Sequence, residues 1–126
     1  IDDAPFCNSG SYCVRIRDGS ESSFVETASY DLSDYDDIEI EYSMIADSME
    51  DGEGYWVEAW DGSTWVTLRN YIAGVDFHNG VRQTISISVS SDDLASMTEA
   101  KLRFRNDGSG NGDSTYFDDI KIYVWR

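Results

Sequence analysis

The chain has 126 residues, of which 40% are hydrophobic and 13% aromatic, and its formal net charge is −16. This length suits one domain with one core, and the hydrophobic content excludes a disordered segment. The negative charge disfavours both nucleic acid and an anionic membrane surface, which need clustered Lys and Arg. No apolar run approaches the roughly 20 residues of a membrane-spanning helix. We expect residues 1–126 to form one domain, excised from a larger secreted protein.

Two cysteines, Cys7 and Cys13, lie close together near the start of the chain. A structural zinc site needs four ligands, and the chain offers only one histidine besides these cysteines. Their spacing is also wider than that of a CxxC redox motif. The pattern predicts a small disulfide loop, and therefore an oxidising, extracellular compartment. Two free thiols in an intracellular protein are the alternative.

Apolar and polar residues alternate along most of the chain, which is typical of strands with one buried face. The clearest runs are 12–17, 38–44, 55–60, 81–89, 100–105 and 118–124, and weaker strands are expected at 24–28 and 65–71. Asp61-Gly62-Ser63 is a hairpin signal. The only helix-like piece is a single turn at 91–97.

Some eight short strands predict an all-β fold, an antiparallel two-sheet β-sandwich. Jelly-roll topology is the variant that suits this length. In such a fold the first and last strands lie side by side and antiparallel.

Several short segments follow one another along the chain: SMEDGE (48–53), DGSTW (61–65), DFHNG (76–80), LRFR (102–105) and YFDDIKI (116–122). This order resembles the MAM-like and carbohydrate-binding-module-like jelly-roll accessory domains of secreted bacterial hydrolases and proteases. The resemblance covers residues 12–124 and implies a non-catalytic β-sandwich that binds glycans or other extracellular partners. It also implies a structural calcium ion. The four cysteines of many MAM domains are absent from this chain.

Four acidic residues are candidate calcium ligands. Asp18 continues the inward parity of the first strand, and Asp118 that of the last, so the two carboxylates meet if these strands are antiparallel neighbours. Calcium takes roughly six to eight oxygen ligands and would offset the repulsion between them. Glu53 and Asp113 are further candidates. Alternatively, both aspartates face water, and the acidic composition serves solubility.

The segment 54–65 contains three of the four tryptophans. Trp56, Glu58 and Trp60 share one parity, and glutamate is rarely buried, so we expect this set on an outer sheet face. Outward arginines of a later strand suit the same face, where a polysaccharide stacks on aromatic rings and meets charged groups. The predicted ligand-binding residues are Trp56, Glu58, Trp60, Arg69, Arg103 and Arg105.

Two alternatives for this face are ordinary cross-strand packing and burial against a neighbouring domain. Trp65, which follows the hairpin turn, is expected to pack over the edge of the core. Trp125, near the terminus, is expected to form a lid or a contact with another domain.

The sequence carries no catalytic motif. His78 is the only histidine and lies in a turn sequence, without a nucleophile elbow. The carboxylates of Glu39, Glu41 and Glu58 are the more serious catalytic candidates, but an acidic chain yields such pairs by chance. We predict a non-enzymatic, secreted carbohydrate-binding module whose partners are a polysaccharide and an attached catalytic or surface domain. The alternative is a MAM-like protein-binding adhesion or domain-docking module.

Overall fold

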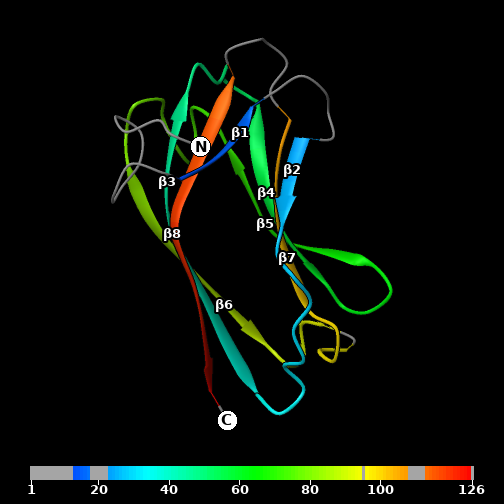
Figure 1. Ribbon diagram of the computed structural model, residues 1–126. Coiled ribbons are helices and arrows are strands. Elements are labelled where there is room, and N and C mark those ends of the chain that lie inside the picture. The colour runs from blue at the N-terminus through cyan, green and yellow to red at the C-terminus, as the bar shows by residue number, and fades with distance from the viewer. Residues whose placement is uncertain (1–12, 18–22, 95, 108–112, 126) are drawn as a thin grey trace.

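The computed structural model describes residues 13–17, 23–94, 96–107 and 113–125, which form eight strands (Figure 1). The strands are β1 (Val14–Arg17), β2 (Ser23–Glu26), β3 (Asp37–Asp47), β4 (Gly54–Trp60), β5 (Trp65–Ile72), β6 (Gln83–Ser90), β7 (Lys101–Asn106) and β8 (Ser114–Trp125). These described residues include no helix, and hence none long and apolar enough to cross a membrane.

The prediction of a helical turn at 91–97 is wrong for the described residues of this segment. Residues 91–94 form turns and bends. The Asp93 carboxylate accepts a hydrogen bond from the Ser90 amide at 2.8 Å. The Asp93 amide also donates a hydrogen bond to the Ser90 carbonyl at 3.0 Å, so the segment closes as a single turn between residues 90 and 93.

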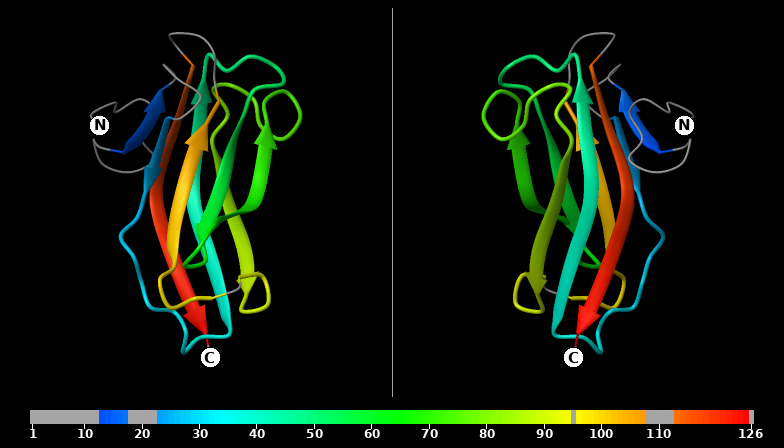
Figure 2. Two further views of the ribbon diagram at one scale, coloured as in Figure 1. Left: turned by 90° about the vertical axis from the view of Figure 1, so that its right-hand side faces the viewer. Right: turned by 90° about the vertical axis from the view of Figure 1, so that its left-hand side faces the viewer.

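The strands form two four-stranded sheets, ordered β1-β8-β3-β6 and β2-β7-β4-β5. All strand pairs are antiparallel, and the only hairpin within one sheet joins β4 and β5. Figure 2 shows the β2-β7-β4-β5 sheet from outside on its left and the opposite sheet on its right. This order confirms the predicted all-β sandwich with jelly-roll topology. The first and last strands pair antiparallel, as expected, with Val14 opposite Phe117.

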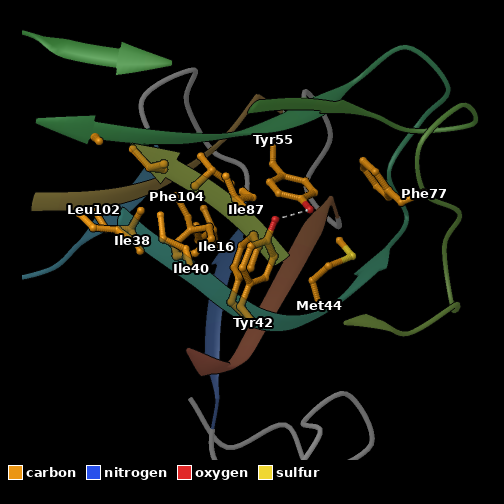
Figure 3. Packing of buried hydrophobic residues seen from close by; sticks show 14 of the residues in the cluster. Ile16, Ile38, Ile40, Tyr42, Met44, Tyr55, Phe77, Ile87, Leu102 and Phe104 are labelled. Atoms are coloured by element: carbon orange, nitrogen blue, oxygen red, sulfur yellow. Dashed lines mark hydrogen bonds between the residues drawn. The ribbon is translucent and has the colours of Figure 1, made fainter. Parts of the chain in front are cut away.

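The core fills the space between the sheets with alternate residues of each strand. Tyr42 of β3 is fully buried, and its ring lies edge-on to Phe104 and Phe117, at centroid distances of 4.9 and 5.7 Å. Its hydroxyl lies 2.9 Å from that of Tyr55 (Figure 3). Burial raises the pKa of both phenols far above the usual value of 10.0, so both groups remain neutral and hydrogen-bonded.

A bulge in β8 changes which of its side chains face the core. Beyond the Ser43–Asp118 pair, the register shifts because β8 has one residue more than β3. Asp119 there adopts a left-handed φ of 52°. Phe117 packs in the core before the bulge, and Ile120 and Val124 pack against the core after it. The prediction that Asp118 points inward in phase with Ile120 is therefore wrong, since Asp118 lies on the outer side of the sheet.

We predict that Phe104→Ala lowers the free energy of unfolding by about 3–5 kcal/mol, because it removes a large side chain from a packed core. Phe104 is 2% exposed, with its ring centroid 4.5 Å from that of Phe117. Chemical denaturation measures the loss. The matched control is Phe24→Ala, at a side chain that is 48% exposed, and its expected loss is below about 1 kcal/mol. Equal losses in the two variants would contradict this assignment of the core.

Candidate ligand-binding face

The outer surface of the β2-β7-β4-β5 sheet carries aromatic and basic side chains in a regular array, which we call the Trp–Arg face. Pleating turns alternate residues of β4 outward, and the antiparallel register places a basic residue of β7 opposite each of them. The pairs are Trp56–Arg105, Glu58–Arg103 and Trp60–Lys101, and Trp65 of β5 lies on the other side of Trp60. The Trp–Arg face comprises Trp56, Glu58, Trp60, Trp65, Lys101, Arg103 and Arg105.

The turn between β4 and β5 holds two of these tryptophans together. The Asp61 carboxylate accepts hydrogen bonds from the backbone amides of Ser63 and Thr64, at 3.0 and 2.9 Å. These amides, Thr64 first, lower the pKa of Asp61 below its usual value of 3.8. Gly62 supplies the left-handed φ of 95° that the turn needs. The turn thus sets the register that pairs Trp60 with Trp65.

Glu58 is the electrostatic centre of the face. It is only 5% exposed, although glutamate is rarely buried. Its Oε1 atom accepts hydrogen bonds from the Nε atoms of Arg103 and Arg105, at 2.9 and 3.2 Å. A carboxylate can be held this far from water because two guanidinium groups neutralise and bind it. Glu58 therefore fixes the position of both arginines.

The guanidinium groups in turn lie over the aromatic rings. The Cζ atom of Arg105 is 4.0 Å from the centroid of the Trp56 ring, and that of Arg103 is 4.0 Å from the Trp65 ring. Arg103 also lies 5.3 Å from the ring of Phe24. The three tryptophans of the face are half-buried, so each cation–π contact occupies one ring face and leaves part of the ring accessible.

The structure brings together five of the six predicted ligand-binding residues and leaves out Arg69. Beyond the pair of Glu58 with Thr67, β5 contains one extra residue, so Arg69 lies opposite the inward-facing Val57. Its Nη1 atom donates a hydrogen bond to the Leu68 carbonyl at 2.6 Å. The expectation that Arg69 joins the face is therefore wrong, because the bulge changes the parity of β5.

The prediction for Trp65 is also wrong. Trp65 does not pack over the core edge, because its pairing with Trp60 turns it outward. The two indole rings lie 5.5 Å apart. Lys101, whose Nζ is 5.9 Å from the ring of Trp60, is a further member of the face that sequence reasoning did not select. Lys101 alternates in phase with Arg103 and Arg105 in the sequence, and this pattern indicates that all three face the same side of the sheet.

The predicted calcium ligands are not brought together in the described part of the chain. Among those residues no three His, Cys, Asp or Glu side chains form a group that could hold a metal ion. The Glu53 carboxylate accepts a hydrogen bond from the Glu50 amide, and that of Asp118 from the Asp119 amide. Asp113 is buried just before β8. Asp18 lies outside the described residues, so a site completed by it stays a prediction.

The geometry assumed for Asp118 was also wrong. The last strand begins at Ser114, not near Asp118, and Arg17 at the end of β1 lies opposite Ser114. Asp113 is thus the acidic residue next to that end of β1.

Two other predicted features are only partly visible. Cys13 is buried, but Cys7 lies outside the described residues, so the disulfide stays a prediction. His78 is exposed in the loop between β5 and β6.

Structural comparison finds this arrangement of strands in other proteins. The CBM22-1 and GH10 modules of Clostridium thermocellum xylanase 10B, complexed with xylohexaose, are similar over 96% of this chain and 23% of that chain, with a TM-score of 0.68 and 14% identity. TmCBM61 in complex with β-1,4-galactotriose is similar over 98% of this chain and 79% of that chain, with a TM-score of 0.60 and 11% identity. The chain has a carbohydrate-binding-module-like jelly-roll fold.

An adhesin domain has the same fold. The K3 cleaved adhesin domain of Lys-gingipain from Porphyromonas gingivalis is similar over 89% of this chain and 74% of that chain, with a TM-score of 0.62 and 15% identity. No protein-family model and no curated protein sequence matches the chain. The predicted resemblance to jelly-roll accessory domains is therefore confirmed at the level of the fold.

We predict that Glu58→Ala lowers the free energy of unfolding by about 1–3 kcal/mol, because two charge-assisted hydrogen bonds are lost and two arginines lose their counter-ion. The matched control is Glu26→Ala, with an expected change in the free energy of unfolding below about 0.5 kcal/mol. Glu26 is an exposed glutamate of β2, which pairs with β7 on the side away from β4, and it lies opposite Arg103. Urea denaturation distinguishes the two. A Glu58→Ala variant as stable as the control would show that Glu58 does not anchor the face.

The calcium prediction is tested by thermal unfolding with excess calcium and with a chelator. A bound ion raises Tm because it binds the folded chain only. We expect the rise to disappear in Asp113→Asn, whereas Asp34→Asn, at an exposed aspartate, keeps it. Identical melting curves of the unmodified chain in the two conditions would exclude a structural calcium ion.

Proposed function

We propose that this domain is a non-catalytic carbohydrate-binding module. In this proposal it binds polysaccharide on the Trp–Arg face and targets an attached extracellular enzyme or surface protein. The observation that carries the proposal is the gathering of three tryptophans and three basic side chains on one sheet face, around one buried carboxylate. Two proteins with the same fold, by their names, bind xylohexaose and β-1,4-galactotriose, which supports a glycan as the class of ligand.

The chemistry of the face favours a glycan with carboxylate groups. Glu58 uses only the Nε atoms of Arg103 and Arg105, so their Nη amino groups can bind an incoming oxygen ligand. The side chains of these arginines are 17% and 27% exposed. Guanidinium groups bind carboxylates in a two-point geometry, and Lys101 adds a third positive charge along β7.

The aromatic rings supply the apolar part of the surface. Trp56 and Trp60 are four positions apart on β4, which places them about 13 Å from each other along the strand, with Glu58 between them. One face of the Trp56 ring is covered by Arg105, so a sugar ring would stack on its open part or displace the guanidinium group. These rings lie on the outer side of a sheet, where a chain-like ligand could run along β4.

The proposal includes no catalytic step. The buried carboxylate of Glu58 is already bound by two arginines, and Glu39 and Glu41 lie on the other sheet. His78 is exposed in a loop. Glu39 and Glu41 both lie on the outer side of β3, so turnover of a bound glycan would contradict the non-catalytic proposal.

We predict that the domain migrates more slowly in affinity gels that contain polygalacturonate, an anionic polysaccharide. Trp56→Ala and Arg105→Ala should each weaken this binding about tenfold or more, because each removes a contact in the centre of the face. Trp125→Ala, on the opposite sheet, is the matched control and should bind as the unmodified chain does. Neutral polysaccharides, tested in parallel, report whether charge or stacking dominates.

Unchanged retardation of the Trp56→Ala and Arg105→Ala variants, with unchanged melting curves, would exclude the Trp–Arg face as the glycan site. Absence of binding to every polysaccharide would exclude the proposed function.

The second candidate function is a protein-binding adhesion or domain-docking module. Tryptophan and arginine are the residues that dominate protein interfaces, and here they lie on one face. An adhesin domain, by its name, has the same fold. Binding of a separately produced neighbouring domain of the parent protein, lost in Trp56→Ala and without any glycan binding, would favour this function.

A further inference from the structure

A second aromatic surface lies on the outside of the opposite sheet, at the C-terminal end of β8. The bulge at Asp119 turns Tyr123 and Trp125 outward, and they are 40% and 49% exposed. Their ring centroids lie 6.3 Å apart, and the ring planes differ by 31°. In contrast to the tryptophans of the Trp–Arg face, neither ring is among those covered by a guanidinium or ammonium group in the described structure. They form an exposed pair of tilted rings.

The neighbouring strands β3 and β6, which lie beside β8 in one sheet (Figure 2, right), continue this surface. Their outward side chains are of two further kinds. Beyond the bulge, each outward residue of β8 lies opposite a carboxylate of β3, and each of these carboxylates lies opposite a serine of β6. Strands are about 4.8 Å apart, and outward residues on one strand about 7 Å apart. This aromatic–acid face consists of the rows Trp125–Asp37–Ser90, Tyr123–Glu39–Ser88 and Lys121–Glu41–Ser86.

The carboxylates of this face are available to a ligand. In the described part of the chain, Asp37, Glu39 and Glu41 form no ion pair, and the Glu39 carboxylate accepts only a long hydrogen bond from the Ser86 hydroxyl, at 3.5 Å. Three carboxylates against the single ammonium group of Lys121 give the face a negative potential. It therefore attracts cations and repels the carboxylated glycans that suit the Trp–Arg face.

We propose that the aromatic–acid face is a second glycan-binding site, selective for polysaccharides with protonated amino groups. The apolar faces of amino-sugar rings stack on Tyr123 and Trp125, while their ammonium groups bind Glu39 and Asp37. An ammonium group over an aromatic ring is further stabilised by the cation–π interaction. The serine hydroxyls of β6 can hydrogen-bond the sugar hydroxyls. This site lies on the other sheet and takes a ligand of opposite charge, so it goes beyond the proposed function.

The charge of the face decides between possible occupants. Nucleic acids and anionic polysaccharides are repelled by the three carboxylates. A neutral glycan can stack on the rings but gains nothing from the carboxylates beyond ordinary hydrogen bonds. A basic peptide would satisfy the carboxylates but lacks the flat apolar rings that match an aromatic pair. Among these occupants, an amino-sugar chain offers flat apolar rings and positive charges in alternation. A basic peptide, whose cations can also lie over aromatic rings, is the competitor that the test includes.

The test is isothermal titration calorimetry of the full chain with a glucosamine hexasaccharide, at mildly acidic pH and low salt. Under these conditions the sugar amino groups are protonated, and Asp and Glu remain ionised. The comparison ligands are the N-acetylated hexasaccharide, which is neutral, and hexalysine, which has similar charge but no sugar. The variants are Trp125→Ala, Glu39→Gln and, as a control on the opposite face, Trp56→Ala.

We expect the amino-sugar chain to bind about tenfold or more tightly than its N-acetylated form and than hexalysine. Trp125→Ala should raise its Kd about tenfold, and Glu39→Gln about threefold to tenfold, with unchanged Tm. Trp56→Ala should change the Kd by less than about twofold. Glu39→Gln preserves the shape of the side chain, so its effect reports the charge alone.

Absence of binding, or binding that survives both Trp125→Ala and Glu39→Gln, would overturn the site. Equal affinity for the N-acetylated chain would overturn its selectivity for amino groups, and equal affinity for hexalysine would overturn the assignment to a glycan. Because polygalacturonate binding and the Trp56→Ala variant report the Trp–Arg face separately, failure of one site is distinguishable from failure of the other.

Discussion

The packing of Tyr42, Phe104 and Phe117 between the two sheets determines which residues of their strands point outward. These rings come from β3, β7 and β8, and they meet at centroid distances of 4.5 to 5.7 Å. Because successive side chains of a strand alternate between faces, burying one residue commits its neighbours to the outer surface. Burial of Phe104 thus places Arg103 and Arg105 outside, where Glu58 binds them. The two faces proposed to bind ligands are therefore consequences of the core.

The two outer faces differ in chemical character although the chain as a whole is strongly acidic. On the Trp–Arg face, a buried carboxylate organises two arginines, which in turn lie over tryptophans. On the aromatic–acid face, carboxylates stand in a row along β3 between aromatic rings and serines. The core determines which positions of each strand face outward, but it does not restrict the chemical type of the side chains at these positions. The same fold can therefore present surfaces of opposite charge, and its likeness to carbohydrate-binding modules does not identify the ligand.

Two bulges account for the wrong assignments of Asp118 and Arg69. Simple alternation places Asp118 inward with Ile120, and it allows Arg69 to join the Trp–Arg face. The extra residue in β8 reverses the first assignment, and the extra residue in β5 reverses the second. Bulges carry no strong sequence signal here, because neither Asp119 nor Leu68 is a glycine. The side chain of Asp119 tolerates the left-handed backbone that a bulge requires, which a one-dimensional pattern does not reveal.

The sequence by itself determined the fold class and most strand positions. Alternation with period two is imposed by burial of one strand face, and it is readable without knowing the partner strands. It also placed Trp56, Glu58, Trp60, Arg103 and Arg105 on an outer surface. Only the tertiary structure decided that Glu58 is buried between two arginines, that Trp65 joins Trp60, and that Tyr123 and Trp125 stand beside a row of carboxylates. Such contacts depend on strand order and register, which arise from packing between residues far apart in the chain.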